Sequence, residues 1–222
     1  MKKYKIFISR YLEETSVFKN MLTSNAIEIY NMSLIKFSPL PYNDLKADWI
    51  FFYSKTAVKY FLEQNGEIKA RKVATFGAAT AKYLSDKYAI TVNFIGTGER
   101  QNVAKKFKAI IGDSTCLYIV GKNSIRSIQI LLKNKCNKEI IVYNNVPKTD
   151  FNVPIPDIAV FTSPMAVSTY YKKFSSREHF NIAIGPTTLQ GLKKIGKTNN
   201  KMASEPTEKA MAKEVQTYLN NF

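Results

Sequence analysis

One phrase occurs twice in this sequence, and the repeat constrains the fold more than any other feature. Residues 48–58 read DWIFFYSKTAV and residues 157–167 read DIAVFTSPMAV, each with an acidic start, an apolar run, a serine and an Ala-Val pair. A second pair follows, because FGAATAKYL at 76–84 resembles IGPTTLQGL at 184–192. Self-similarity of this length indicates a chain built from two similar units.

The two copies are circularly permuted. After its shared part, the first copy continues through CLYIVG and EIIVYNNV, and the second copy has no such continuation. The counterpart lies at the beginning of the chain, in KYKIFIS and AIEIYNM. We therefore predict a continuous domain over 40–146, a discontinuous domain formed by 1–35 and 155–222, and interdomain crossovers at 36–39 and 147–154.

Short apolar runs alternate with helical patterns along the chain. Runs such as WIFFY, CLYIVG and IAVFT are typical of buried strands, and each precedes a segment with helical periodicity. The fold class is therefore α/β, with two doubly wound parallel-sheet domains joined by two hinge strands, and with a cleft between them. Ligands of such sheets bind beyond the carboxyl ends of the strands. The pattern also predicts helices over 11–24 and 124–134 and a strand over 89–95.

The charge balance is strongly basic. The 33 Lys and Arg residues outnumber the 17 Asp and Glu residues, which gives a net charge of +16. Such a surplus favours a polyanionic substrate or partner, and nucleic acid is the usual candidate. The basic residues are spread along the chain, however, with no arginine-rich arm or zinc-finger spacing. A solvated lysine-rich surface is an equal alternative.

Several function classes lack their motifs. Cys116, Cys136 and His179 are the only cysteines and histidine, and they are too scattered for a Cys/His zinc site, so we expect no metal. Gly-Thr-Gly at 96–98 matches only the first part of the G-x-G-x-x-G motif of dinucleotide-binding proteins. No apolar run approaches the ~20 residues that span a bilayer. The apolar run before Arg10 is much shorter than the ~7–15 residues of a secretory signal, so we expect no signal peptide. We expect a cytoplasmic protein.

Hydroxyl residues lie at strand–helix junctions in both copies. Helix N-termini carry free N–H groups and a partial positive charge, so they bind carboxylates. Each hydroxyl can instead be a simple helix cap, which contributes about 1 kcal/mol to helix stability. Their paired occurrence in the two copies favours a binding role. The residues are Ser54, Thr80, Ser163, Thr187 and Thr188.

Six segments carry a family likeness. IFISR, YIVGKNSIR, IVYNNVP, FTSPMAV, IAIGPTT and ASEPTEKAMA follow one another along the chain. In this order they resemble the uroporphyrinogen-III synthase family, including its tyrosine-containing segment before the second crossover. FYSKTAV departs from the family pattern, with lysine where proline is common. The likeness covers nearly the whole chain.

The resemblance implies an enzyme of tetrapyrrole, porphyrin and heme biosynthesis, a carbon–oxygen lyase. Members of the family close hydroxymethylbilane, a linear tetrapyrrole with eight carboxylates, to uroporphyrinogen III with loss of water and inversion of the terminal ring. The hydroxyl leaves to give an azafulvene cation, and a spiro intermediate then fragments and recloses. The resemblance implies no cofactor and a monomer that binds this small-molecule substrate, with neither nucleic acid nor membrane as partner.

The resemblance also assigns residues to roles. Tyr143, at the end of EIIVY, would donate a proton to the leaving hydroxyl, as a phenol near a reacting oxygen can. A packed strand tyrosine is the alternative for this residue. Substrate carboxylates would be bound by Ser54, Thr80, Ser163, Thr187 and Thr188, by the backbone amides of Ala166 and Gly185, and by the charges of Arg10, Lys122 and Arg126. A solvated surface role is an equal alternative for the three basic residues.

Two other function classes stay open at this stage. A two-lobed protein that binds a small anion without chemistry would return hydroxymethylbilane unchanged. A basic nucleic-acid-binding module would bind arbitrary DNA with a steep salt dependence.

Overall fold

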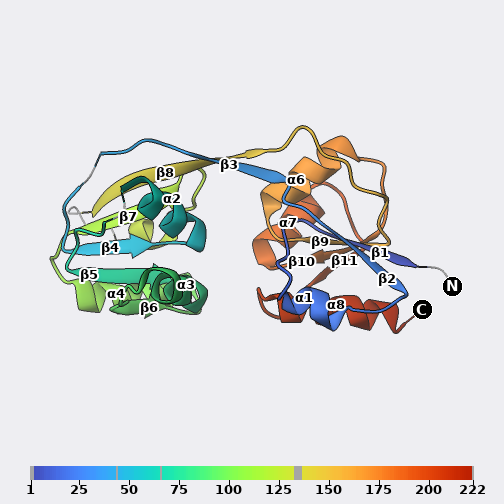
Figure 1. Cartoon of the computed structure of the whole chain (residues 1–222), viewed down its shortest axis with the longest axis horizontal. Coiled ribbons are helices and arrows are strands. Elements are labelled where there is room, and N and C mark those ends of the chain that lie inside the picture. Colours follow the sequence, from blue (N-terminus) through green and yellow to red (C-terminus); the bar gives the residue numbers. More distant parts are fainter. Residues whose placement is uncertain (1–2, 44, 66, 133–136, 222) are drawn as a thin grey trace. The chain divides into compact units, whose positions relative to one another are not determined.

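The structure is a computed structural model that describes residues 3–43, 45–65, 67–132 and 137–221. Cys136 and the last residues of the predicted helix 124–134 lie outside the described residues. Contacts between residues divide the chain into two units, both of which appear in Figure 1. Unit 1 comprises Met1–Lys36 and Val146–Phe222, and unit 2 comprises Phe37–Asn145.

Unit 1 is built on a five-stranded sheet with the order β11-β10-β9-β1-β2, in which every neighbouring pair is parallel. All four residues of β9 are buried, as expected of a central strand with helices on both faces. The strands are β1 (Tyr4–Ile8), β2 (Ile27–Asn31), β9 (Ile158–Phe161), β10 (Phe180–Ala183) and β11 (Asn200–Met202).

Helices cover both faces of this sheet (Figure 1). They are α1 (Val17–Met21), α6 (Pro164–Lys173), α7 (Pro186–Lys194) and α8 (Glu208–Leu219). Ile6 and Val160 pack with α1 and α8 on one face, whereas Phe7 and Phe161 pack with α6 and α7 on the other. Because successive residues of a strand point to opposite faces, β1 and β9 each contribute to both cores.

Unit 2 is built on a six-stranded sheet with the order β3-β8-β7-β4-β5-β6. The pairs β8-β7, β7-β4, β4-β5 and β5-β6 are parallel. All residues of the central strands β4 and β7 are buried. The strands are β3 (Ile35–Pro39), β4 (Trp49–Phe52), β5 (Lys72–Phe76), β6 (Phe94–Gly96), β7 (Cys116–Gly121) and β8 (Asn137–Pro147).

Four helices cover the two faces of the second sheet (Figure 1). They are α2 (Lys55–Asn65), α3 (Ala78–Tyr88), α4 (Arg100–Ile111) and α5 (Ser127–Leu132). Ile50 and Phe52 pack with α2 and α3 on one face, and Phe51 packs with α4 and α5 on the other. The permuted pattern read from the sequence is thus a strand–helix alternation in both units.

One edge strand departs from the predicted parallel sheets. Leu40 donates its N–H to the carbonyl of Val142 at 3.0 Å, and Lys148 donates to the carbonyl of Leu34 at 2.9 Å. Partner numbers therefore rise on β3 as they fall on β8, so these two strands are antiparallel. The segment 36–39, predicted as a crossover and one of two hinge strands, lies entirely within β3. Backbone groups at the two ends of β3 pair with the chain at β8.

Three predicted elements are shorter than the sequence pattern indicated. The helix expected over 11–24 is only α1, which begins after Ser16 caps the N–H of Lys19. The helix expected from residue 124 begins after Arg126, whose φ of 57° is left-handed and ends any helical run before it. The strand expected over 89–95 is only β6, since Ala89 ends α3 in a left-handed conformation.

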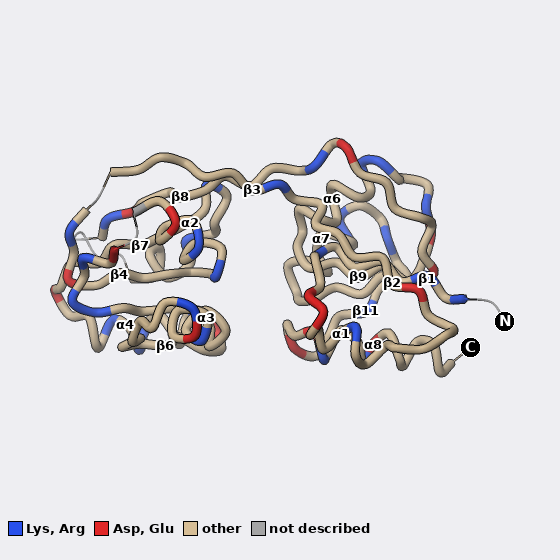
Figure 2. The backbone as a smooth tube through the Cα atoms, viewed as in Figure 1, with Lys and Arg blue, Asp and Glu red and all other residues tan. Residues whose placement is uncertain are grey.

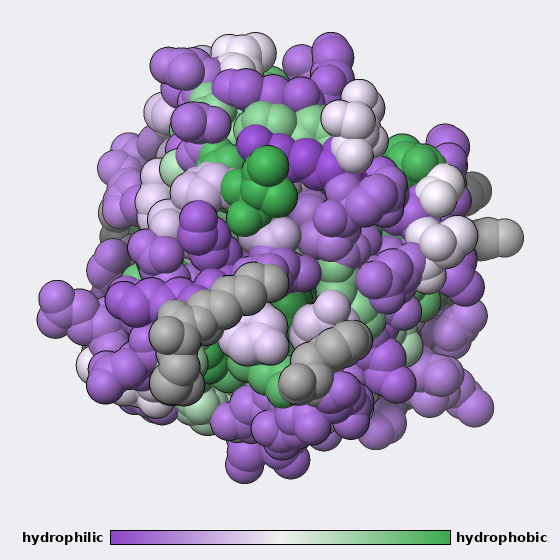
Figure 3. Space-filling model, turned by 90° about the vertical axis from the view of Figure 1, so that its right-hand side faces the viewer, coloured by the Kyte–Doolittle hydropathy of each residue, from purple (hydrophilic) through white to green (hydrophobic). Residues whose placement is uncertain are grey.

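The surface is mostly hydrophilic on the face that Figure 3 shows, with hydrophobic residues scattered over it. Figure 2 shows Lys and Arg on helices, strands and loops of both units, with Asp and Glu interspersed. A nucleic-acid-binding protein usually concentrates its positive charge in one patch or stripe. The distribution along the backbone is instead the dispersed one that the sequence indicated.

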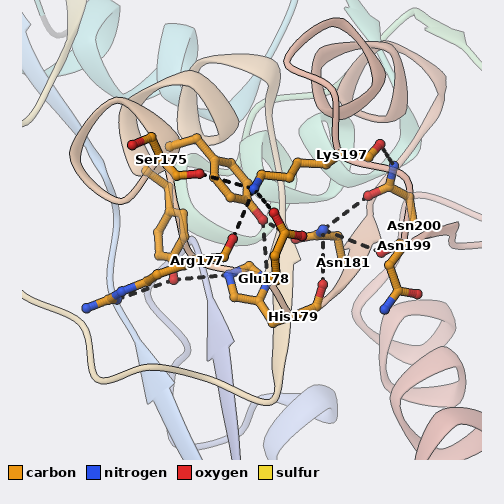
Figure 4. Close-up of polar contacts among 10 residues, drawn as sticks. Ser175, Arg177, Glu178, His179, Asn181, Lys197, Asn199 and Asn200 are labelled. Carbon is orange, nitrogen blue, oxygen red and sulfur yellow. Dashed lines mark hydrogen bonds and ion pairs between the residues drawn. The ribbon is translucent and has the colours of Figure 1, made fainter.

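A buried polar network surrounds the only histidine, at the start of β10 (Figure 4). The Nε2 and Nδ1 atoms of His179 lie 3.2 Å and 3.4 Å from the hydroxyls of Tyr170 and Tyr171. Tyr171 donates its proton to Oδ1 of Asn181 at 2.8 Å.

A buried lysine extends this network. The ammonium of Lys197 donates to the carbonyls of Ser175 and Arg177 and pairs with Glu178. The loops on either side of β10 are therefore held by side chains.

We expect this network to make unit 1 sensitive to acid. Burial lowers the pKa of His179 to about 4 from the ordinary 6.5, so the unfolded chain binds the proton first as pH falls. The free energy of unfolding should drop by about 3 kcal/mol between pH 7.5 and 4 from this residue alone. Urea unfolding across that range measures the drop. His179→Gln should flatten it, and an unchanged slope would show that His179 is not responsible.

Candidate active site

The repeated phrase has the same local structure in both units. Ser54 follows β4 and Ser163 follows β9, and each begins the next helix. The Oγ atom of Ser54 accepts the N–H of Ala57 at 3.1 Å, and that of Ser163 accepts the N–H of Ala166 at 3.1 Å. Both serines are helix caps, and the hydroxyl of Ser163 can still donate its own proton to a ligand. The amide of Ala166, predicted to bind a carboxylate, is already used in the cap.

The junction before α7 lacks a capping side chain. Gly185 has an extended backbone and makes no side-chain cap, and a Cβ built on it meets no atom within 4 Å. Thr187 is exposed in the first turn, whereas Thr188 is buried and its N–H donates to the carbonyl of Gly185. The backbone and Thr187 are thus presented outward, as a carboxylate site at a helix N-terminus requires. Thr188, expected in the same role, packs inward.

A hydroxyl pair that the sequence analysis missed joins two neighbouring strands of unit 1. Ser9 follows β1 and Thr162 follows β9, and Ser9 Oγ accepts the N–H of Thr162 at 2.9 Å. Their two hydroxyl oxygens are 3.3 Å apart. The signal was present, because IFIS and AVFT both end in hydroxyl residues and lie on adjacent strands. Arg10, the next residue, is exposed at the same edge of the sheet.

Tyr143 is packed against the end of the neighbouring strand in unit 2. Tyr143 is 9% exposed. Its ring stacks on that of Tyr60, with the centroids 5.4 Å apart, and its centroid lies 5.7 Å from that of the Phe37 ring. A Cβ on Gly121 would lie 2.3 Å from Cζ of Tyr143 and 2.6 Å from its hydroxyl. Only glycine leaves room for the phenol at this place. The ring position is therefore fixed on several sides.

Tyr143 of β8 lies beside the carboxyl end of β7, and Ser54 and Ser124 follow the neighbouring strands β4 and β7. Burial raises the pKa of Tyr143, and the nearby Ser54 and Ser124 side chains oppose part of that rise. Ser124, which the sequence analysis did not select, also accepts the N–H of Gly121 on its Oγ at 2.9 Å. A phenol with a raised pKa keeps its proton at neutral pH. The arrangement can present a proton donor that two serines orient.

Arg126 is engaged within unit 2. Its guanidinium forms a two-pronged ion pair with Glu139, at 2.7 Å from Nε and 2.9 Å from Nη2. Its Nη1 donates to the carbonyl of Ser124 at 2.8 Å. The predicted substrate contact of Arg126 thus competes with an ion pair, and the side chain holds the loop that carries Ser124. Lys122 has an exposed side chain, and its N–H donates to the carbonyl of Tyr143 at 2.9 Å.

Two further hydroxyl residues lie near the strand–helix junctions of unit 2, and both are turned inward. The hydroxyl oxygen of Tyr53 accepts the N–H groups of Ile128 and Gln129, both at 3.1 Å, so it caps α5 from the end of β4. Burial raises the pKa of Tyr53 to about 12. Thr80, predicted to bind a carboxylate, is only 5% exposed on α3, behind a glycine at position 77 with φ of 91°. Neither hydroxyl is presented outward.

The described part of the chain contains neither a cluster suited to a metal ion nor a membrane-spanning helix. No cluster of three or more His, Cys, Asp or Glu side chains there could hold a metal ion. No helix among those residues has the length and apolar character needed to cross a bilayer.

A family model matches most of this chain, and solved structures share its fold. Residues 17–213 match the family model described as Uroporphyrinogen-III synthase HemD. The fold is similar to the uroporphyrinogen-III synthetase of Helicobacter pylori, with a TM-score of 0.72 at 20% identity over 98% of this chain and 100% of that one. It is also similar to a mutant uroporphyrinogen III synthase of Thermus thermophilus, with a TM-score of 0.61 at 12% identity over 99% and 100%.

Curated proteins give no match. The solved structures, at these identities, support the two-unit α/β architecture. The family model spans most of the sequence and includes the junctions after β4, β7, β8, β9 and β10. The chain therefore belongs to the uroporphyrinogen-III synthase family.

Proposed function

We propose that this chain closes hydroxymethylbilane to uroporphyrinogen III with Tyr143 as the proton donor. The cyclisation, a step of tetrapyrrole biosynthesis, is the activity of the family to which the chain belongs. The observation that carries the residue assignment is the packing of Tyr143 against Gly121 at the carboxyl end of β7, next to the junctions where Ser54 and Ser124 follow β4 and β7. That edge is where open parallel sheets bind their ligands.

In this mechanism the phenol of Tyr143 protonates the hydroxyl of the substrate as the carbon–oxygen bond breaks. Water leaves, and the remaining azafulvene cation is attacked by the substituted carbon of the terminal pyrrole. The spiro intermediate fragments and recloses with that ring inverted. The ring carbon then loses a proton, which restores aromaticity, and a proton returns to the Tyr143 phenolate, so the overall change is loss of one water. Ser54 and Ser124 orient the phenol throughout.

The junctions of unit 1 supply carboxylate binding. The free hydroxyl proton of Ser163 and the outward-facing first turn of α7, with Gly185 and Thr187, are suited to this role. The exposed side chains of Arg10 and Lys122 add positive charge at the ends of β1 and β7. Holding a flexible substrate at several points favours one ring-closure geometry over others, which is how positioning lowers a barrier.

A complementation experiment tests the proposed function. A bacterial strain that lacks its own uroporphyrinogen-III synthase needs added heme, and expression of this chain should restore growth without it. Tyr143→Phe, expressed at the same level, should restore growth poorly. Failure of the unaltered chain to support growth, despite soluble expression, would contradict the proposal.

Salt should weaken substrate binding more than catalysis. The net charge of +16 attracts a substrate with eight carboxylates, and exposed charges are screened as salt rises. Between about 0.05 and 0.5 M salt we expect the KM to rise about fivefold or more while kcat stays within about twofold. Initial rates over this range provide the measurement. A KM that is independent of salt would show that charge does not contribute to binding.

We also propose that the enzyme acts as a monomer in the cytoplasm and without nucleic acid. The proposal rests on the family resemblance and on the dispersed basic residues in Figure 2. Light scattering should give a mass near 25.3 kDa at micromolar concentration. A stable mass near twice that value, or tight binding of arbitrary DNA at physiological salt, would contradict it.

A further inference from the structure

A cavity in unit 1 combines apolar walls with lysines. It has a volume of about 420 Å³ and lies between α6 and the segment that follows β8. Pro147 and the buried ring of Phe151 form part of one side, and Thr169 of α6 forms part of the other. Volumes of ~300–1,000 Å³ are typical of small-molecule sites, and this one is near the lower end.

Three lysines line this cavity, namely Lys148, Lys172 and Lys173. The ammonium of Lys148 lies 5.4 Å from the Tyr11 ring and donates to its hydroxyl at 3.3 Å. Lys173 donates to the carbonyl of Phe151 and lies 4.9 Å from its ring. The lysine stems therefore follow apolar surface while their charges stay at the rim. No carboxylate is among the lining residues of this cavity, all of which the structure describes.

Thr169 carries an unpartnered polar group into this wall. The residue is 5% exposed, and its hydroxyl has no hydrogen-bond partner among the described residues. A buried hydroxyl without a partner is costly, and such groups call for an explanation. Threonine in a helix has two accessible χ1 rotamers, so the hydroxyl can turn toward a ligand seated against α6.

Other cavities of the described residues differ in charge. The cavity of about 630 Å³ beside α3 has one lysine, Lys82, which pairs with Asp86 at 2.8 Å. The cavity of about 500 Å³ at the start of β10 is lined by Asp157, Glu178 and His179. A cavity of about 390 Å³ shares Ser168 and Lys172 with the lysine cavity, and its second lysine, Lys197, pairs with Glu178. The lysine cavity is therefore distinguished from these three by having three lining lysines and no acidic lining residue.

We propose that the lysine cavity binds a small organic anion, with one carboxylate, sulfonate or phosphate on a flat apolar body. The apolar body lies against Pro147 and Phe151, the anionic group meets Lys148 and Lys172, and the Thr169 hydroxyl gains a partner. The volume suits a ligand much smaller than the octacarboxylate substrate. The site is distinct from Tyr143 and the strand–helix junctions, so it does not depend on the proposed chemistry.

Calorimetry and amide chemical shifts with 2-naphthoate test the proposal on the full chain. We expect saturable binding at one site, with the shifts gathered in 147–151 and 168–173. Lys172→Gln should weaken binding about threefold to fivefold, and Lys148→Gln with Lys172→Gln about tenfold or more. Lys209→Gln, an exposed lysine on α8, is the matched control and should leave the affinity unchanged.

Two further measurements distinguish a specific anion site from nonspecific binding to an apolar surface. The neutral 2-naphthalenemethanol and inorganic phosphate should each bind at least about tenfold more weakly than 2-naphthoate, because each offers only half of the recognition. Thr169→Val should lower the affinity and raise the denaturation midpoint, since it removes a hydroxyl that only the ligand satisfies. Equal binding of the neutral analogue, shifts located elsewhere, or lysine variants with unchanged affinity would overturn the proposal.

Discussion

Tyr143→Phe should lower turnover by about 10²–10⁴-fold, the usual cost of losing general-acid assistance. The substitution keeps the ring against Gly121, Tyr60 and Phe37 and removes only the hydroxyl, which lies near Ser54 and Ser124. Stability should change by no more than about 1 kcal/mol, the worth of one hydrogen bond. Discontinuous assays with correction for spontaneous closure give the rate.

The control for this variant is Tyr83→Phe. Tyr83 lies on α3, where its hydroxyl accepts an exposed hydrogen bond from Lys87 at 3.3 Å. Tyr83→Phe also removes a phenol hydroxyl from unit 2, and it should leave turnover unchanged. If Tyr143→Phe retains full turnover and the type III product, Tyr143 is not the proton donor, and substrate positioning is left as the source of catalysis.

Gly121→Ala should damage both the fold and the activity, because its Cβ would lie 2.3 Å from the Tyr143 ring. The ring or β7 must move, and overpacking of this kind typically costs about 1–3 kcal/mol of unfolding free energy. A displacement of the donor by about 1 Å can cost about 10²-fold in rate. We expect both losses in one variant, measured by urea unfolding and by turnover.

Gly191→Ala is the matched control. A Cβ at this position of α7 would make ordinary contacts of 3.5–3.9 Å with Pro164 and Val167, and alanine is the better helix former by about 0.5–1 kcal/mol. Adding Tyr143→Ala to Gly121→Ala should relieve the clash, so the two stability losses should not add. Additive losses would mean that Gly121 is needed for its backbone and not for the space it leaves.

The local features of this fold could be predicted from the sequence. Apolar runs such as IAVF become strands buried at every position, and serines soon after such runs become helix caps. Ser54 and Ser163 share this geometry because cap formation depends only on the residue itself and the next three. The repeat therefore identified the corresponding junctions in both halves.

Contacts between residues that are distant in the sequence could not be predicted in this way. Tyr53 caps a helix 75 residues further along the chain, and Arg126 pairs with Glu139 across a loop and a strand. Such contacts depend on the order of the strands in the sheet, because this order decides which strand ends and loops are neighbours. A local pattern does not contain this information. Ser124 was missed for the same reason, since it becomes relevant only when β7 and β8 are neighbours.

The inward placement of Thr80 and Thr188 illustrates a second limit. Both lie in the first turn of a helix, as the sequence indicated, yet both side chains are buried. A junction position fixes the backbone, and the rotation of the helix against its sheet decides which side chain faces outward. Thr187, one residue earlier than Thr188, is the exposed one.

The isomer composition of the product tests the central claim most directly. Hydroxymethylbilane, made enzymatically and incubated with the purified chain, should be converted to uroporphyrinogen III faster than it closes by itself. After oxidation, chromatography should show the type III isomer in large excess over type I. A product that is entirely type I, formed at the rate of the enzyme-free control, would contradict the account.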